Sequence, residues 1–241
     1  MSVTSQSIKK LVACTQYPWL LYVVFKHRVL ASLDHLPVLR PSYKTVVDIG
    51  ANSGQFALAS YVSKAGLIYA FEPLDKPYRK LRSIFKNIPN VYLFNSAIGP
   101  ESTQKNMYIS AKQDSSSLLP ITEKQAEFFP GTHTVSRGSV HVDRLNSFIC
   151  ESDIHHPSML KIDVQGYELG VLNGCSELLE HFDVVYCECS FCELYEGQPL
   201  AHEIISFLEK QNFLLAGVFN STFDHAGQSI QADFLFKRLD I

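Results

Sequence analysis

Hydrophobic positions follow two spacings along the chain, and the switch between them marks the predicted elements. Short apolar runs bounded by glycine, proline or polar residues predict buried strands, whereas apolar residues three or four apart predict helices. The predicted strands are 45–49, 67–71, 91–95, 105–109, 139–142, 159–163, 184–190, 213–219 and 232–237, and the predicted helices are 56–62, 75–87, 144–150, 168–172, 176–181 and 203–211. Because strands and helices alternate over most of the chain, we expect an α/β sheet with mostly parallel strands.

The turn after the first strand has the composition of a nucleotide-binding turn. Asp48 lies near the end of that strand, Gly50 and Gly54 follow in a run of small residues, and a helical pattern begins directly afterwards. Glycine lets the backbone come close to a ligand, because a Cβ would collide with it or strain φ. The second strand is followed by Glu72, 18 residues after Gly54, where a carboxylate can accept ribose hydroxyls.

The order of residues in this turn favours a cationic ligand over a diphosphate. Asn52 and Ser53 stand where the dinucleotide-binding motif G-x-G-x-x-G would place glycine. Asp48 also suits a ligand that carries positive charge, and S-adenosylmethionine carries an ammonium and a sulfonium. A nicotinamide-dependent oxidoreductase and a non-catalytic cofactor-binding module remain the alternatives. Calorimetry with NADH and with S-adenosylmethionine distinguishes the oxidoreductase from a protein that binds S-adenosylmethionine.

A second strand-turn-helix stretch lies in the C-terminal half of the chain. An apolar strand ends at Asp163, the chain turns at Gly166, and a helix begins near Glu168. In an open parallel sheet, ligands bind beyond the carboxyl ends of the strands at the point where the strand order reverses. We therefore expect Asp48 and Asp163 to face one crevice, with capping of the following helix as the structural alternative for Asp163.

Composition narrows the class of protein. The 241 residues are 46% hydrophobic and 19% charged, which fits one soluble α/β domain with a sizeable core. A net charge of −3 and a pI near 6.3 argue against a general nucleic-acid binder. No apolar run reaches the roughly 18 to 20 residues that span a bilayer, and the N-terminus lacks the pattern of a cleavable signal peptide. The chain is therefore predicted to be cytoplasmic.

Three of the six cysteines lie close together, at Cys187, Cys189 and Cys192. They could belong to a zinc site together with His155 and His156. The alternative is a buried strand in which cysteine is a small apolar residue, and we prefer it because a second C-x-x-C is missing. Disulfides are not expected in a cytoplasmic protein.

Two segments fit the predicted sheet less clearly. Residues 1–40 form a predicted N-terminal helical extension, with helical potential over 7–30, and residues 41–241 form the main domain. Packing of the extension on the core is the preferred interpretation, and contact with a membrane surface or with a second copy of the chain is the alternative. The irregular segment 110–138 is long enough to be a lid, a binding loop or a solvated linker.

Five motifs occur in the order typical of one enzyme family. They are 47–54, 71–73, 95–99, 116–118 and 160–168, the last reading Leu-Lys-Ile-Asp-Val-Gln-Gly-Tyr-Glu. In these motifs the chain resembles the FkbM family of S-adenosylmethionine-dependent methyltransferases, over about residues 45–237. It departs from the commonest pattern at Gln165, where Glu is frequent, and at Asn146, where Asp is frequent. The second departure weakens any assignment of a base near that position.

The resemblance implies a fold and an activity. The expected fold is the Rossmann-like, seven-stranded class I methyltransferase sheet, mostly parallel with a closing antiparallel strand and with helices on both faces. The expected reaction is methyl transfer from S-adenosylmethionine to a hydroxyl of a sugar, glycolipid or secondary metabolite. Residues 41–241 are then the methyltransferase domain, and the expected partner is a small-molecule or glycan acceptor and not a nucleic acid. A homo-oligomer and a peripheral membrane contact through the N-terminal segment stay open.

The same comparison suggests roles for individual residues. Asp48 and the glycine turn are expected to hold the methionine end, Glu72 the ribose, and Asn95 and Ser96 the adenine. The full set expected to bind the cofactor is Asp48, Gly50, Asn52, Ser53, Gly54, Phe56, Glu72, Pro73, Asn95, Ser96, Ala97 and Asp163.

A hydroxyl acceptor needs a base within hydrogen-bond reach to remove its proton. Asp163 is the first candidate, followed by Glu168 and Glu188, while His133 and His141 flank the irregular segment and have a suitable pKa range. No metal site is predicted. A divalent ion held by Asp163 and another carboxylate is the remaining alternative.

Overall fold

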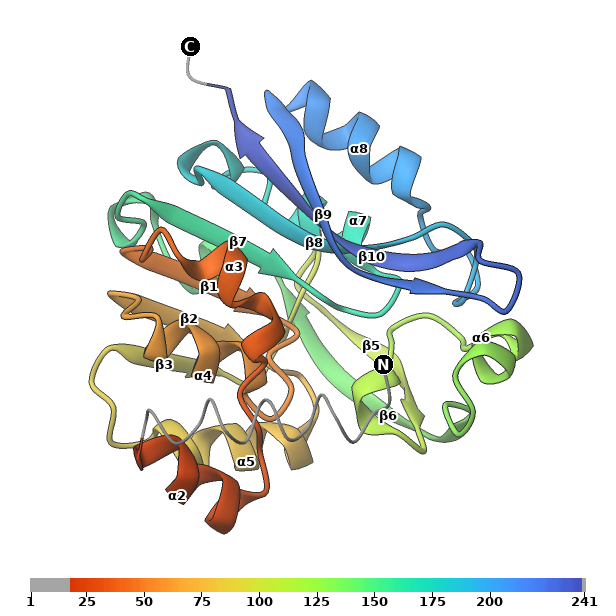
Figure 1. The fold of residues 1–241 in the computed structure, drawn as a ribbon, viewed down its shortest axis with the longest axis horizontal. Helices are drawn as coiled ribbons and strands as arrows, with labels where there is room; N and C mark the ends of the chain where they lie inside the picture. Colours follow the sequence, from red (N-terminus) through yellow and green to blue (C-terminus); the bar gives the residue numbers. More distant parts are fainter. Residues whose placement is uncertain (1–17, 240–241) are drawn as a thin grey trace.

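The computed structural model describes residues 18–239, so Cys14 and the first part of the predicted N-terminal helix lie outside the described residues. Its main sheet has seven strands in the order β3-β2-β1-β7-β8-β10-β9 (Figure 1). They are β1 (Thr45–Ile49), β2 (Leu67–Phe71), β3 (Val91–Phe94), β7 (Ser158–Ile162), β8 (Val184–Ser190), β9 (Phe213–Phe223) and β10 (Ser229–Arg238). Neighbours from β3 to β8 pair in parallel, and β10 runs antiparallel to both β8 and β9. The predicted fold class is confirmed.

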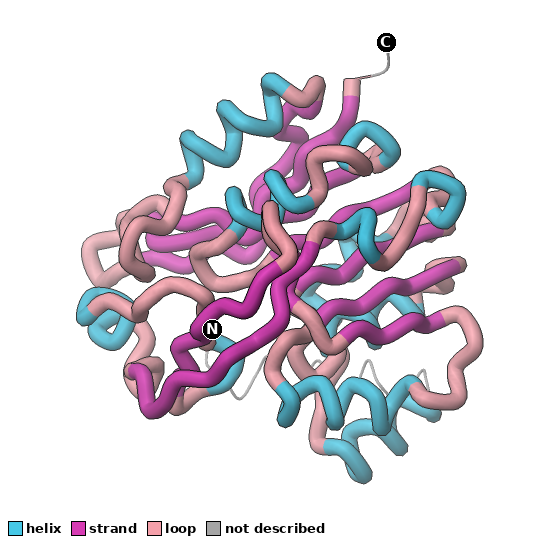
Figure 2. Tube along the Cα trace, turned by 180° about the vertical axis from the view of Figure 1, so that it is seen from behind, coloured by secondary structure: helices cyan, strands magenta, loops and turns pink. Residues whose placement is uncertain are grey.

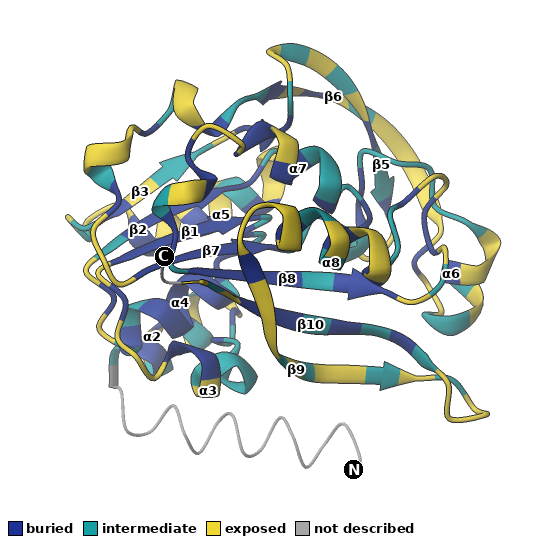
Figure 3. Cartoon of the chain, turned by 90° about the horizontal axis from the view of Figure 1, so that it is seen from above, coloured by how far each residue is buried: buried dark blue, intermediate teal, exposed yellow. Residues whose placement is uncertain are grey.

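Alternate residues of the strands face two separate hydrophobic cores, which explains why helices cover both faces of the sheet. Val46 and Met159 belong to one core, whereas their neighbours Val47 and Leu160 belong to the other. Figure 3 shows this layering, with buried strands between helices. The first face carries α2 (Pro18–His27), α3 (Leu36–Leu39), α4 (Gln55–Val62) and α5 (Asp75–Phe85), and the second carries α7 (Glu168–Gly174) and α8 (Ala201–Lys210).

The described part of the N-terminal extension packs on the core. Leu20 and Val23 of α2 are buried, and the Trp19 ring lies 5.1 Å from that of Tyr61 and 6.2 Å from that of Phe85. Apolar contact with α4 and α5 therefore holds α2 in place. Within residues 18–239, no helix is both long enough and apolar enough to cross a membrane.

The segment predicted to be irregular contains regular structure. β5 (Thr103–Ser110) and β6 (Thr134–Asp143) pair antiparallel, and β4 (Ala97–Ile98) joins them in a small sheet of order β4-β6-β5. Figure 2 shows β5 and β6 projecting away from the main sheet. Between them lie a short 3-10 helix (Gln113–Ser115) and α6 (Glu123–Phe128), which begins where the Thr122 hydroxyl accepts a hydrogen bond from the Gln125 N–H. The sequence missed α6 and most of β6, because the first part of β6 is exposed and only its last residues alternate between exposed and buried positions.

Two predicted helices are wrong in type and length. The structure has only single 3-10 turns at Leu145–Ser147 and Leu179–His181 in place of the helices expected at 144–150 and 176–181. The apolar residues that suggested helices are instead side chains that pack a short turn on the sheet, because Leu145 and Leu179 are both buried in the second core. A short turn with one or two anchored side chains produces the same local pattern as a helix.

Candidate active site

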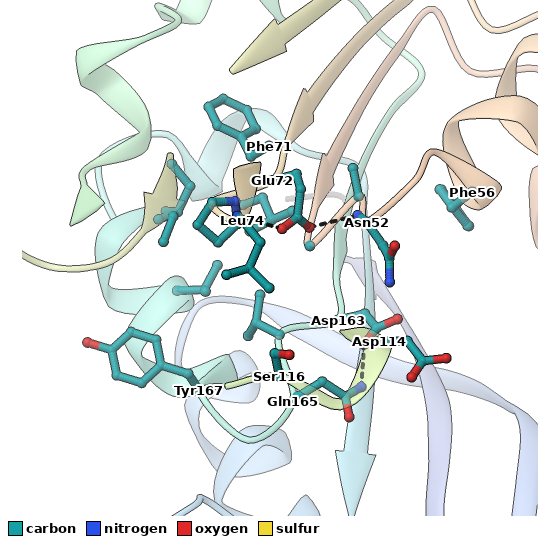
Figure 4. A pocket seen from close by; sticks show the side chains of 18 of the residues that line it. Asn52, Phe56, Phe71, Glu72, Leu74, Asp114, Ser116, Asp163, Gln165 and Tyr167 are labelled. Atoms are coloured by element: carbon teal, nitrogen blue, oxygen red, sulfur yellow. Dashed lines mark hydrogen bonds between the residues drawn. The ribbon is translucent and has the colours of Figure 1, made fainter. Parts of the chain in front are cut away.

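A cavity of about 950 Å³, partly open to solvent, lies at the carboxyl ends of β1, β2 and β7. β1 pairs with β2 on one side and with β7 on the other, so the strand order reverses at β1 and a crevice opens there. The loops after these strands line the cavity, together with β4, the segment before β1 and the short helix after β5 (Figure 4). The cavity thus lies at the switch point, where the sequence predicts the site.

Gly50 and Gly54 serve different purposes, although both adopt a left-handed backbone, with φ of +80° and +96°. Gly50 lines the cavity, and a Cβ there would lie 1.8 Å from the carbonyl oxygen of Asp163. A Cβ on Gly54 would instead meet the Leu81 side chain at 2.8 Å. Gly50 thus lets β1 and β7 approach each other under the cavity, whereas Gly54 lets the turn pack against α5.

Glu72 connects the turns that follow β1 and β2. Its carboxylate accepts hydrogen bonds from the N–H of Asn52 at 2.9 Å and from the N–H of Leu74 at 2.7 Å. Glu72 lines the cavity and is 6% exposed. Burial raises the pKa of Glu72 to about 7, although the two N–H groups favour the charged form. The side chain is therefore near its titration point at neutral pH.

Asp48 forms a buried ion pair with Lys161. The two residues are register partners on β1 and β7, and the Lys161 Nζ lies 3.0 Å from Asp48 Oδ1 and 3.6 Å from Asp163 Oδ2. Lys161 also donates a hydrogen bond to the Gly50 carbonyl at 3.1 Å. Asp48 is completely buried and does not line the cavity, although the sequence predicted that it would face the crevice. Its partner Lys161 does line the cavity. The ammonium group thus holds both strand ends and the glycine turn together.

Burial and ion pairing have opposite effects on these two groups. Burial alone would lower the pKa of Lys161, but the charges of Asp48 and Asp163 outweigh it and raise that pKa above its ordinary value. Burial raises the pKa of Asp48, although Lys161 partly counteracts it. We therefore describe Lys161 as a permanent cation at the cavity wall, with Asp48 as its buried counter-charge.

Asp163 faces the cavity and is linked to Glu188 through Gln165. The Gln165 amide donates hydrogen bonds to Asp163 Oδ1 at 2.8 Å and to Glu188 Oε2 at 2.9 Å (Figure 4 shows the first). Its carbonyl oxygen accepts one from the Tyr195 hydroxyl at 2.8 Å. The Gln165 amide is therefore oriented by three partners, and it fixes the Asp163 carboxylate. Among these residues, Asp163 and Gln165 line the cavity, whereas Glu188 lies behind them.

Comparison with known proteins identifies the family of the chain. A model of the methyltransferase FkbM domain matches residues 48–215, which contain the end of β1, the glycine turn and the motif around Asp163. The chain belongs to the FkbM methyltransferase family. It is 27% identical over 190 residues to 2-O-methyltransferase NoeI of Sinorhizobium fredii, a match that covers 76% of each chain. It is 26% identical over 163 residues to Methyltransferase 1 of Beauveria bassiana, covering 60% of this chain and 63% of that one.

Among solved structures, this FkbM methyltransferase matches magnesium protoporphyrin IX methyltransferase from Synechocystis PCC 6803, solved with bound SAM. The TM-score is 0.47 and the sequence identity 12%, covering 96% of this chain and 83% of that one. The family and the fold identify the chain as an S-adenosylmethionine-dependent methyltransferase. The cavity fits that cofactor, because the buried Glu72 carboxylate faces it on one side and the carboxylates of Asp163 and Asp114 face it on the other (Figure 4). These groups match a ribose diol and a cationic methionine end.

The twelve residues predicted to bind the cofactor divide into two groups. Those that line the cavity are Gly50, Asn52, Phe56, Glu72, Pro73, Ser96, Ala97 and Asp163. Those that do not are Asp48, Ser53, Gly54 and Asn95. The Asn95 amide donates to the carbonyls of Glu72 and Pro73 at 2.9 and 3.0 Å, so it shapes the loop that carries Glu72.

The other candidate bases lie away from the cavity. Glu168 is 3% exposed, and its carboxylate accepts a hydrogen bond from the Gly166 N–H at 2.9 Å. Burial raises the pKa of Glu168 to about 7. His141 lies 3.5 Å from Asp143 on β6, and neither it nor His133 lines the cavity. Of the proposed bases, the structure thus brings only Asp163 to the cavity wall.

Two of the three cysteines considered for a zinc site lie on a buried strand. Cys187 and Cys189 lie on β8 and are buried in the second core, and the His156 ring pairs with Asp183 at 2.8 Å. Over residues 18–239, no group of three or more His, Cys, Asp or Glu side chains is arranged to hold a metal ion.

Among the acidic, basic and histidine side chains of the cavity wall, sequence reasoning missed three: His35, Asp114 and Lys161. A signal existed for Lys161, because a lysine inside an apolar strand and two residues before Asp163 must share that residue's face of the sheet. No local signal existed for Asp114 or His35, which reach the cavity from segments far away in the sequence.

Proposed function

We propose that the protein methylates a hydroxyl group of a carbohydrate acceptor, either a free sugar or the sugar part of a glycolipid. The main support is the chemistry of the cavity lining, which includes the carboxylates of Asp163 and Asp114 and the amide of Gln113. Carboxylates and amides are the groups that exchange hydrogen bonds with several neighbouring hydroxyls. A related chain that bears the name 2-O-methyltransferase adds support.

The assignment of residues to the cofactor follows from which groups line the cavity. We propose that Glu72 accepts hydrogen bonds from the ribose, and that the methionine end lies near Gly50, Asn52 and Asp163. Ser96 and Ala97 would adjoin the adenine, beside the apolar side chains of Phe71, Leu74 and Ile98. When bound, S-adenosylmethionine supplies a methyl group on a sulfonium, and its transfer breaks the carbon–sulfur bond with the electron pair going to sulfur.

The remaining task of the protein is to position the acceptor oxygen and to take away its proton. Positioning counts for much of the rate in such a displacement. Asp163 is suited to positioning, because its two carboxylate oxygens are held by Gln165 at 2.8 Å and by Lys161 at 3.6 Å. At the same time, 39% of its side chain stays exposed. We propose that Asp163 orients either the acceptor hydroxyl or the ammonium of the methionine end.

The test is transfer of a tritiated methyl group from labelled S-adenosylmethionine to a panel of acceptors. The panel contains oligosaccharides with free hydroxyls, their 2-deoxy counterparts, a catechol, and a peptide mixture. We expect label in the oligosaccharides, in a linkage that survives mild alkali, because methyl ethers resist hydrolysis and methyl esters do not.

The matched control for this assay is Glu168→Gln, which changes a buried carboxylate outside the cavity and is expected to keep the product unchanged. Label found only in the peptides or the catechol, or lost on treatment with alkali, would contradict a carbohydrate hydroxyl as the acceptor.

Cofactor affinity should depend on pH through Glu72. Its pKa is raised to about 7 in the free protein, so the carboxyl gains a proton as the pH falls below that value. A protonated carboxyl is a weaker acceptor for the two ribose hydroxyls than a carboxylate. We expect the affinity for S-adenosylhomocysteine, measured by calorimetry, to fall by up to about tenfold per pH unit below pH 7 and to level off above it.

The Glu72→Gln variant distinguishes this side chain from other titrating groups. It should bind the ligand about tenfold more weakly at pH 8 than the wild type does, and with little change between pH 6 and 8. Glu168 has a similarly raised pKa but does not line the cavity, so Glu168→Gln should keep the wild-type pH dependence. If Glu72→Gln keeps it as well, Glu72 does not hold the ribose.

A further inference from the structure

His35 is a cavity residue that no role considered above uses. It ends a short 3-10 helix (Leu33–His35) in the segment before β1, and its side chain is 20% exposed. It lines the same cavity as Asp163. Its ring centroid lies 5.4 Å from that of Phe56 and 5.6 Å from that of Tyr186, both in edge-to-face geometry. Two aromatic side chains therefore fix the plane of the imidazole.

Within the described residues, the polar contacts of the His35 ring all involve Nδ1. The Tyr186 hydroxyl lies 2.9 Å from Nδ1, and Asp233 Oδ2 lies 3.6 Å away. The Tyr186 hydroxyl donates to Asp233 Oδ2 at 3.0 Å, and the Asn220 amide donates to the same oxygen at 2.7 Å. The Asn220 amide nitrogen also lies 3.3 Å from Nδ1, but the Tyr186 hydroxyl is nearer and directs its single proton at Asp233. We therefore assign a proton to His35 Nδ1, which donates it to the phenol oxygen.

This hydrogen bond fixes the tautomer of the imidazole. A neutral ring that carries its proton on Nδ1 has an unprotonated Nε2 with a free lone pair. Within residues 18–239, no hydrogen bond or ion pair engages Nε2. The ring thus has an unprotonated basic nitrogen at Nε2. On its other side, Nδ1 is hydrogen-bonded to Tyr186, which in turn donates to the Asp233 carboxylate.

The charges around His35 keep its ring neutral at rest and can stabilise it when charged. Burial lowers the pKa of His35, Asp233 on β10 counteracts this, and Lys161 on β7 lowers it further. Asp163 at the cavity wall and Asp34 on the same 3-10 helix favour the charged form to a smaller extent. The base form is therefore present at neutral pH, and a proton gained by the ring is compensated by Asp233.

We propose that His35 is the general base of the reaction and takes the acceptor's hydroxyl proton on Nε2. Tyr186 and Asp233 act as positioning residues. The role rests on the proposed function, since a hydroxyl acceptor is a poor nucleophile until a base removes its proton. The O–H bond breaks toward Nε2, its electron pair stays on the oxygen, and the oxygen bonds the transferred methyl carbon. The imidazolium then releases its proton to solvent.

Asp163 is less suited to this step, although it lines the same cavity. Gln165 donates to one of its oxygens at 2.8 Å, and Lys161 lies 3.6 Å from the other. Protonation of Asp163 would weaken its attraction to Lys161. Protonation of Nε2 breaks no contact within the described chain, and it strengthens the attraction between His35 and Asp233.

The first test needs neither cofactor nor acceptor. In protein labelled with 15N at histidine, two-bond 1H–15N correlation at pH 7.5 should show the His35 ring neutral with its proton on Nδ1. Tyr186→Phe should weaken that preference, and the exposed His141 serves as the internal reference. A ring protonated on Nε2, or an imidazolium at this pH, would overturn the proposal.

The second test measures turnover with the oligosaccharide that the wild type methylates. His35→Asn keeps a donor near the position of Nδ1 but has no basic nitrogen, and we expect kcat at pH 7.5 to fall about 100-fold or more. Its affinity for S-adenosylhomocysteine should stay within about threefold of the wild type. The acid limb of the wild-type pH profile should disappear in the variant.

Chemical rescue distinguishes loss of the imidazole base from loss of the folded structure. Imidazole added to His35→Ala should restore part of kcat, with a dependence on the concentration of neutral imidazole, and should not affect His141→Ala. Wild-type turnover in His35→Asn, or no rescue of His35→Ala, would overturn the role of His35 and leave the proposed function intact. A wild-type protein that binds S-adenosylhomocysteine but methylates no hydroxyl would instead overturn the proposed function.

Discussion

Replacing Lys161 by methionine is expected to destabilise the folded protein by about 3–5 kcal/mol, the usual cost of removing one partner of a buried ion pair. Asp48 is completely buried, and Lys161 is the cation nearest to it at 3.0 Å. Methionine has similar volume and no charge, so it leaves the Asp48 carboxylate without a counter-charge. The hydrogen bond to the Gly50 carbonyl is also lost.

The measurement is denaturant unfolding at several pH values. Without Lys161, which lowers the pKa of Asp48, that pKa rises further above its unfolded value. Lys161→Met should therefore be most stable at low pH and lose stability as the pH rises through the folded pKa of Asp48. The double variant Asp48→Asn/Lys161→Met should recover much of the loss, since no buried charge remains.

The matched control for this series is Lys44→Met, which removes an exposed lysine next to β1 and should change stability by less than about 0.5 kcal/mol. Equal effects of the Lys161 and Lys44 substitutions, or a double variant as unstable as Lys161→Met, would show that the buried pair does not hold β1 and β7 together.

Local sequence patterns predicted the part of the site that lies on consecutive elements. The strand, turn and helix around Gly50 are contiguous, and a carboxylate directly after a strand must lie at the sheet edge wherever that strand is placed. For this reason Glu72 and Asp163 could be placed at the cavity from their positions alone. The same reasoning could not tell Gly50 from Gly54, because only the packing of α5 shows that Gly54 faces Leu81.

Residues that reach the cavity from distant segments could not be predicted in this way. His35 lies in the N-terminal segment that lacked any family resemblance, and its neighbours Tyr186 and Asp233 come from β8 and β10. Tyr186 reads as an ordinary apolar position of a buried strand until the pairing of β8 with β10 is known. Long-range pairing of strands, which local periodicity does not encode, brings this group of residues together.

Gly50→Ala should have the second large effect, a loss of about 4 kcal/mol or more, which includes failure to fold. A Cβ at this position would lie 1.8 Å from the carbonyl oxygen of Asp163 and 2.8 Å from its carbonyl carbon. Both atoms belong to the backbone, so no side chain can move to relieve the overlap, and the ends of β1 and β7 must separate. A left-handed φ of +80° adds the usual penalty for a residue with a Cβ.

Gly227→Ala separates the two contributions to this effect. Gly227 has nearly the same φ, +82°, but a Cβ there would meet no atom within 4 Å. Its substitution should therefore cost only the backbone penalty, about 1–2 kcal/mol in thermal or denaturant unfolding. Any soluble Gly50→Ala protein should also bind S-adenosylhomocysteine far more weakly, whereas Gly227→Ala should bind it normally. Equal losses of stability for the two variants would mean that backbone conformation alone, and not the close approach of the two strands beneath the cavity, requires glycine at position 50.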